Sequence, residues 1–163
     1  MLDPELTKLA DKIIQLCVEK KLKISTAESC TGGLVAACLT SVAGSSLVFE
    51  RGYITYANAA KVEEIGVPPA LLSAHGAVSE EVAKAMAKGA RQKAGADVAI
   101  AITGIAGPGG GSPEKPVGLV YIGLCTAREC EAKRFLFEGD RADIRRQTVT
   151  KALAWLLATG KEL

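Results

Sequence analysis

The sequence predicts an α/β protein, a three-layer α/β/α sandwich built on a mixed, mostly parallel sheet of about five strands. Two observations predict this fold class. Segments with helically spaced apolar residues alternate with β-branched or apolar runs, and helices between strands imply parallel crossovers. Late in the chain, two strand-like segments follow each other with a short connection, which adds an antiparallel hairpin. A chain of 163 residues can bury one core, so we expect residues 1–163 to form a single domain.

The first half of the chain is predicted to begin with a helix. Apolar residues recur at helical spacing over 4–20, Asp3 can cap this helix, and Pro4 suits its first position. Three elements are expected to follow: a short strand at 22–28, a buried helix at 32–42 and a β-branched, aromatic strand at 46–56.

The second half is predicted to bring three helical segments, a strand, a hairpin and a last helix. Gly66 closes the first of these helices, and Ser79 caps the third, whose first turn holds Glu80 and Glu81. The predicted elements are a helix at 58–66, a turn or short helix after 68–69, a helix from 79 to about 92, a buried strand at 97–103, a glycine-rich loop at 104–116, hairpin strands at 117–127 and 130–138, and a helix at about 141–158.

The composition limits the binding partners and the cellular compartment that we expect for this protein. The apolar fraction of 48% and charged fraction of 23% are those of a globular protein, and no apolar run reaches the ~18 residues that span a bilayer. The net charge of +2 and the aromatic fraction of 4% give no reason to expect nucleic acid as a partner. The N-terminal segment carries charges every few residues, unlike a signal peptide. We therefore expect a cytoplasmic protein that binds neither membranes nor nucleic acid. Because dimers are the commonest oligomers of soluble proteins, we also expect a homodimer.

The cysteines predict neither a disulfide framework nor a metal site. Their number, five, is odd, and no Cys-x-x-Cys occurs. Scattered free thiols suit a reducing cytosol. No cluster of His, Cys, Asp and Glu has metal-ligand spacing, so we predict no metal and no cofactor.

The stretch "STAESCTGG" (25–33) offers a nucleophile between a strand and a helix. The simple interpretation is that Ser29 or Thr31 caps the following helix. The functional interpretation is that ligands bind at the carboxyl ends of strands in α/β sheets, where the free N–H groups of a helix can hold an oxyanion or a phosphate. Gly32 and Gly33 would let a ligand approach the backbone closely.

A serine nucleophile needs a base, and the sequence leaves two choices open. His75, the only histidine, precedes a helix, where a histidine is more often structural. Lys61 follows a predicted strand end; lysines in such positions are usually solvated, but a buried one could act as a base near neutral pH. Cys30 is a competing nucleophile with His75 as its partner, although such cysteines are more often packing residues.

Two further features could bind phosphate. The loop "TGIAGPGGG" from Thr103 is glycine-rich, but it matches neither a Walker loop nor a dinucleotide fingerprint. Arg145 lies in the first turns of the last helix, where the dipole mildly disfavours a cation unless acids or a bound phosphate compensate.

Five motifs in the same order resemble those of the CinA C-terminal domain family, which includes the bacterial nicotinamide-nucleotide amidases. They are "AESCTGG", "GYITYANAAKVEEIGV", "HGAVSEEVAKAMAKGA", "ITGIAGPGGGSPEKPVGLVYIGL" and "GDRADIRRQ". Each motif is modest alone, but five in order over about residues 5–158 are specific. Larger relatives carry an additional N-terminal domain with pyrophosphatase-type activity, and this chain resembles the stand-alone amidase form.

The resemblance implies hydrolysis of the carboxamide of nicotinamide mononucleotide, a small-molecule nucleotide, to nicotinate mononucleotide and ammonia. It implies that Ser29 is the nucleophile and Lys61 the base. It also implies that backbone amides of Cys30, Thr31 and Gly32 hold the oxyanion. The remaining implied substrate-binding residues are Tyr56, Thr103, Gly104 and Arg145.

Three alternatives remain open at this point. The chain could be a nucleotide-binding module without catalysis, or an interaction module connected with competence and DNA damage, although its charge argues against direct DNA contact. It could also be a thiol amidase that uses Cys30 and His75.

Overall fold

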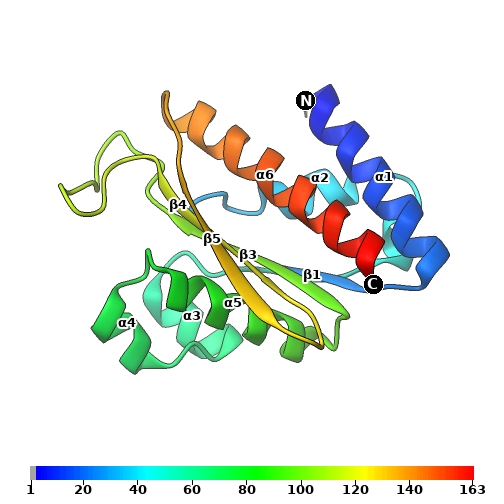
Figure 1. The fold of residues 1–163 in the computed structure, drawn as a ribbon, viewed down its shortest axis with the longest axis horizontal. Coiled ribbons are helices and arrows are strands. Elements are labelled where there is room, and N and C mark those ends of the chain that lie inside the picture. The colour runs from blue at the N-terminus through cyan, green and yellow to red at the C-terminus, as the bar shows by residue number, and fades with distance from the viewer. Residues whose placement is uncertain (1–2) are drawn as a thin grey trace.

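The computed structural model describes residues 3–163, and Figure 1 shows their course. The predicted order of elements is confirmed, with a short 3₁₀ helix added. The helices are α1 (Pro4–Lys20), α2 (Leu34–Thr40), α3 (Asn58–Ile65), α4 (Pro69–His75), α5 (Glu80–Ala94) and α6 (Arg141–Glu162), and a 3₁₀ helix covers Ser45–Leu47. The strands are β1 (Ile24–Glu28), β2 (Phe49–Ile54), β3 (Val98–Gly104), β4 (Leu119–Cys125) and β5 (Cys130–Leu136).

The five strands form one mixed sheet in the order β2-β1-β3-β4-β5. Strands β2 and β3 both run parallel to β1, whereas β4 is antiparallel to β3 and β5 to β4. At the end of β1, Glu28 is in register with Ile54 of β2 and with Ile102 of β3. The three parallel strands therefore end close together at one edge of the sheet.

Helices cover both faces of the sheet, which confirms the three-layer sandwich (Figure 1). Helices α1, α2 and α6 lie on one face, where they share the larger core cluster with residues such as Ile24 and Ile100. Helices α3, α4 and α5 lie on the other face, where the smaller cluster includes Ile65, Met86 and Ala101.

Local signals set several of the element boundaries. The Asp3 carboxylate accepts the amide of Glu5 at the start of α1, and Ser79 Oγ accepts that of Val82 in α5. Gly66 ends α3 with φ at 68°, a left-handed conformation that glycine adopts without a Cβ clash. The strand predicted over 46–56 is shorter than expected, because residues up to Leu47 coil into the 3₁₀ helix.

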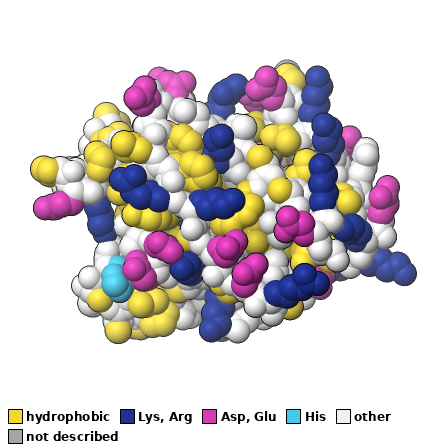
Figure 2. Space-filling view, in the orientation of Figure 1, with side chains coloured by type: hydrophobic (Ala, Val, Ile, Leu, Met, Phe, Trp, Pro, Cys, Tyr) yellow, Lys and Arg dark blue, Asp and Glu magenta, His cyan; other side chains and the backbone are white. Residues whose placement is uncertain are grey.

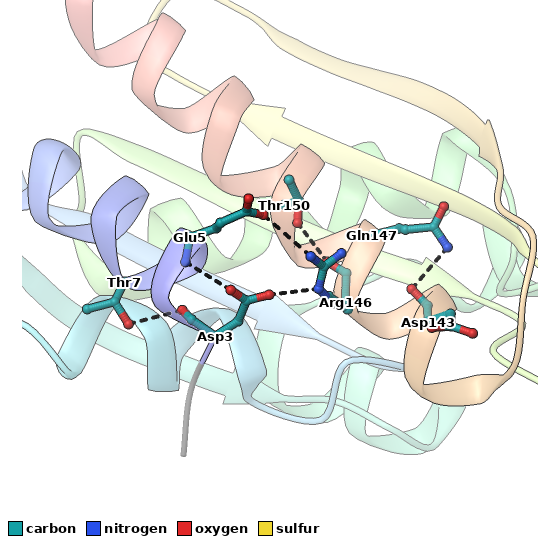
Figure 3. Close-up of polar contacts among 7 residues, drawn as sticks. All are labelled: Asp3, Glu5, Thr7, Asp143, Arg146, Gln147 and Thr150. Carbon is teal, nitrogen blue, oxygen red and sulfur yellow. Dashed lines mark hydrogen bonds and ion pairs between the residues drawn. The ribbon is translucent and has the colours of Figure 1, made fainter.

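The N-terminus of α1 is joined to α6 by exposed ion pairs (Figure 3). Arg146 Nε lies 2.7 Å from a carboxylate oxygen of Asp3, and its Nη2 lies 3.4 Å from Glu5. These pairs join the start of α1 to the first turns of α6, where the two helices pack together. Exposed ion pairs of this kind contribute little to stability in general, so packing between the two helices carries the contact.

The expectation that all five cysteines are free thiols is wrong for one pair. The β4–β5 register places Cys125 opposite Cys130, and a disulfide joins them. Sequence spacing did not reveal this bond because it depends on which residues a hairpin sets opposite each other. Cys17, Cys30 and Cys38 are free and buried.

The surface carries charges of both signs. Figure 2 shows lysine and arginine side chains interspersed with aspartates and glutamates across one face of the molecule. Within residues 3–163, no helix combines the length and apolar character needed to cross a membrane.

Candidate active site

The candidate site lies at the edge of the sheet where the parallel strands β1, β2 and β3 end. After β1 the chain turns to α2 on one face of the sheet, and after β2 it turns to α3 on the opposite face. In open α/β sheets, ligands bind at such a switch point. Ser29 follows β1 directly, and Lys61 lies in the helix that follows β2.

A cavity of about 280 Å³ opens at this point and brings six of the nine predicted site residues together: Ser29, Cys30, Tyr56, Lys61, Thr103 and Gly104. Thr31 is buried beneath the turn and Gly32 is exposed on it, and neither lines the cavity. A larger hollow of about 600 Å³ lies elsewhere, between α5 and the α3–α4 segment, and lacks both Ser29 and Lys61. The smaller cavity is therefore the candidate active site, because it holds both the predicted nucleophile and the predicted base.

Lys61 is almost fully buried, at 1% exposure, and its amine is held by three oxygens. Nζ donates to the carbonyl oxygens of Thr55 at 2.8 Å and Tyr56 at 3.2 Å, and it lies 3.4 Å from Ser29 Oγ. No carboxylate of the described residues forms an ion pair with it. Burial disfavours the charged form and therefore lowers the pKa of Lys61.

This coordination suits a neutral amine. An uncharged amine has two N–H donors and one lone pair. The ammonium form donates to all three oxygens; in the neutral form the carbonyls of Thr55 and Tyr56 can accept both donors, and the lone pair can then accept the hydroxyl proton of Ser29. The arrangement can therefore remove a proton from Ser29 and return it later.

The turn after β1 presents Ser29 on a fixed backbone. The Ser29 amide donates to Ile102 O of β3 at 3.0 Å, and the Gly32 amide donates back to Ser29 O at 3.0 Å. The Gly32 N–H is thus already used, contrary to the expectation that it helps to hold an oxyanion. Among residues 3–163, no oxygen accepts the amides of Cys30 and Thr31, although the Cys30 amide contacts its own sulfur. These two amides are the donors that remain.

Helix α2 is capped by Glu28, not by Ser29 or Thr31 as the sequence suggested. The buried carboxylate of Glu28 accepts the amides of Gly33 and Val35, both at 3.1 Å, and of Ala36 at 2.9 Å. Thr31 Oγ1 is itself buried without a partner in the described structure. The sequence pattern does not reveal this role of Glu28, because its side chain folds forward over the turn and the capping residue therefore stands several positions before the helix.

Arg141 lies at the mouth of the cavity and was not predicted. Its Nη1 donates to Gly107 O at 2.8 Å and its Nη2 to Tyr56 Oη at 3.0 Å. Arg145 instead donates to Thr31 O at 3.0 Å and lines a neighbouring hollow of about 620 Å³, which Arg141 also borders. The sequence shows only that Arg141 opens the last helix; its position beside the glycine-rich loop is a tertiary contact.

The residues at the end of β3 shape the floor of the cavity. Thr103 Oγ1 donates to Ala77 O at 2.8 Å, which ties β3 to the segment before α5. A Cβ on Gly104 would lie 2.7 Å from Val120 Cγ2 and 2.9 Å from Leu119 O. Gly104 is therefore required by the close approach of β4, independently of any ligand.

The geometry does not favour a thiol mechanism through Cys30 and His75. Burial raises the pKa of Cys30 to about 11, so its thiol stays protonated at neutral pH. His75 is exposed at the end of α4, 3.7 Å from Glu81, and does not line the cavity. Across residues 3–163, no three His, Cys, Asp or Glu side chains gather as metal ligands would.

Comparisons with known proteins point to a single family. A family model of the CinA C-terminal domain matches residues 6–159. A CinA-like protein of Citrifermentans bemidjiense is 53% identical over 146 residues, which cover 90% of this chain and 35% of that protein. A putative competence-damage inducible protein of Caldicellulosiruptor bescii is 53% identical over 145 residues, which cover 89% of this chain and 35% of that protein.

Solved structures agree with the sequence comparison. The competence/damage inducible protein of Agrobacterium tumefaciens superposes with a TM-score of 0.94 at 44% identity, over 97% of both chains. Competence damage-inducible protein A of Klebsiella pneumoniae superposes with a TM-score of 0.91 at 35% identity, over 94% of this chain and 95% of that one. The chain spans about 35% of the length of the curated relatives it matches. The protein belongs to the CinA C-terminal domain family.

Proposed function

We propose that this protein is an amidohydrolase that converts nicotinamide mononucleotide to nicotinate mononucleotide and ammonia. One observation carries the proposal: the buried Lys61 Nζ lies 3.4 Å from Ser29 Oγ and donates hydrogen bonds to two main-chain carbonyls. The nicotinamide substrate comes from the resemblance of the motifs to those of the bacterial amidases.

The reaction begins when neutral Lys61 takes the hydroxyl proton of Ser29. The alkoxide attacks the carboxamide carbon, and the oxyanion that forms rests on the amide of Cys30, a residue that lines the cavity. The tetrahedral intermediate collapses as protonated Lys61 gives its proton to the amide nitrogen, and ammonia leaves. An ester joins the nicotinoyl carbon to Ser29 Oγ.

Water then completes the cycle. Lys61, neutral again, removes a proton from water, which attacks the ester carbon. When the second intermediate collapses, the C–Oγ bond breaks and Ser29 recovers its proton from Lys61. The guanidinium of Arg141, at the mouth of the cavity, is our candidate for binding the anionic phosphate of the substrate, because arginine pairs with phosphate through two N–H donors.

Ammonia release from nicotinamide mononucleotide tests the proposal. General-base catalysis is typically worth about 10²–10⁴ in rate, so Ser29→Ala and Lys61→Ala should each lose at least this factor in kcat. The rate losses from substituting two residues that act as a unit are not additive, so the double variant should be no slower than either single variant. Ser73 is exposed and Lys84 is half-buried, and neither lines the cavity, so Ser73→Ala and Lys84→Ala serve as controls.

The same assay distinguishes the non-catalytic alternatives. Near-wild-type turnover by Ser29→Ala would rule out the serine mechanism. Intact substrate after prolonged incubation with wild-type protein, together with tight binding, would favour a nucleotide-binding module instead.

A further inference from the structure

Glu28 is unusual among the acidic residues of the protein because its side chain is buried, at 1% exposure, next to the proposed nucleophile. A buried carboxylate is costly unless hydrogen bonds compensate for lost water. Three main-chain amides, those of Gly33, Val35 and Ala36, supply this compensation. All three belong to the turn and first residues of α2 that follow Ser29.

The main chain of Glu28 also connects with the other half of the site. Glu28 O accepts the amide of Thr55 at 2.9 Å, and Thr55 O in turn accepts Lys61 Nζ at 2.8 Å. The Ser29 amide, one residue on, is fixed to Ile102 of β3. Glu28 therefore contacts both segments that carry the proposed nucleophile and base.

The carboxylate also determines which amides remain for a substrate. It occupies the first free N–H groups of α2, which would otherwise be the natural anion site. The turn amides of Cys30 and Thr31 precede the amides that Glu28 accepts. A displaced carboxylate would let the turn relax and shift these donors relative to Ser29 Oγ.

We infer that Glu28 is a positioning residue: its carboxylate fixes the turn 29–33 so that the Ser29 hydroxyl faces the reacting carbon and the Cys30 amide faces the oxygen bonded to that carbon. The inference rests on the proposed serine mechanism. It predicts a loss in kcat rather than in substrate binding, because the misplaced groups act on the transition state. A misplacement of about 1 Å can cost on the order of 10²-fold in rate.

The decisive variant is Glu28→Gln, which keeps the shape of the side chain but puts an NH₂ group where an amide acceptor is needed. We expect kcat to fall at least about tenfold with KM changed less than about twofold. The pH midpoint of activity should stay where it is, because the contacts of Lys61 remain. Glu28→Asp keeps the charge but shortens the side chain, and it should lie between Glu28→Gln and wild type.

A control must separate the effect of losing a helix cap from the effect of misplacing the Ser29 hydroxyl and the turn amides. Asp3→Ala removes the cap of α1, away from the cavity, and should lower the melting temperature without lowering kcat. Both Glu28 variants are assayed below their melting temperatures. If Glu28→Gln does not fold, Glu28→Asp decides the question.

A substrate-independent measurement separates this inference from the amidase proposal. A fluorophosphonate probe reacts with an activated serine: the Oγ–P bond forms, the P–F bond breaks, fluoride leaves and the hydroxyl proton is released. Mass spectrometry follows the labelling of Ser29, which should be at least about tenfold slower in Glu28→Gln.

The outcomes are distinct. If wild-type Ser29 is labelled but nicotinamide mononucleotide is not hydrolysed, the substrate assignment fails and the labelling rates still decide the role of Glu28. Equal labelling of wild type and Glu28→Gln, or equal kcat, would overturn the inference alone. Absence of Ser29 labelling in the wild type would overturn both.

Discussion

Arg141 donates a hydrogen bond from Nη2 to the phenolic oxygen of Tyr56 over 3.0 Å, although 85 positions separate the two residues. The same guanidinium donates through Nη1 to Gly107 of the glycine-rich loop. Tyr56 also contributes the carbonyl that accepts Lys61 Nζ. One arginine thus connects the loop at the cavity mouth with the residue beside the proposed base.

Arg141→Gln should weaken binding of the phosphorylated substrate more than binding of its riboside. A hydrogen bond to a charged group contributes about 1.5–3 kcal/mol, which corresponds to about a tenfold to hundredfold rise in KM for the mononucleotide. The riboside has no phosphate and should show a much smaller change. Steady-state kinetics with both substrates measures the difference.

Arg145→Gln provides the comparison for this prediction. The sequence placed Arg145 at the phosphate, whereas its guanidinium contacts Thr31 O and borders the neighbouring hollow. We expect Arg145→Gln to raise KM less than Arg141→Gln does. The reverse order would show that the phosphate extends past Arg141 to Arg145.

The pH dependence of kcat/KM should reflect the pKa of the buried Lys61 amine. Only neutral Lys61 can accept a proton, so kcat/KM should rise with pH and reach a plateau. Burial lowers the pKa of Lys61 below its ordinary value of 10.5, so the midpoint should lie at a lower pH than that value. Lys61→Arg stays charged at all accessible pH values and should be inactive throughout. A wild-type midpoint at or above 10.5 would contradict a desolvated base.

Cys30 and His75 should be dispensable for activity. The raised pKa of Cys30, about 11, keeps its thiol protonated, and His75 lies outside the cavity. We expect Cys30→Ala and His75→Ala to keep kcat within about threefold, since neither removes a proton-transfer group. Iodoacetamide should leave activity intact at neutral pH. A dead Cys30→Ala variant that still folds would revive the thiol mechanism.

Gly89 on α5 should not tolerate a methyl group. Alanine normally stabilises a helix interior by about 1 kcal/mol relative to glycine, but a Cβ here would lie 1.8 Å from Ile65 O of α3. Because that neighbour is backbone, α3 must move, and overpacking of this kind costs about 1–3 kcal/mol. Urea unfolding should show the loss as a lower midpoint. Activity should fall too, since α3 carries Lys61.

Gly160→Ala is the matched control for Gly89→Ala. Its added Cβ would lie 3.2 Å from Leu16 Cδ2, the end of a flexible side chain that can move aside. We expect the unfolding midpoint of Gly160→Ala to stay at or above that of the wild type. Equal destabilisation by both substitutions would show that the close contact of Gly89 with Ile65 is not the cause.

Local sequence signals determined the element order and most element boundaries. Asp3, Ser79 and Gly66 act within a few residues of themselves, as caps whose hydrogen bonds and backbone conformations need no distant partner. The same reasoning placed Ser29 at the end of a parallel strand. Because parallel strands end at one edge, the position of the site followed from the fold class.

Only the tertiary structure decided which side chains meet at that edge and in what chemical state. The packing of distant segments decides whether Lys61 is buried and whether Arg141 or Arg145 reaches the cavity. It also decides whether Cys125 faces Cys130. Glu28 could equally have faced solvent had α2 packed differently. The physical reason is that desolvation and side-chain convergence are set by neighbours far away in the chain, which no short stretch of sequence contains.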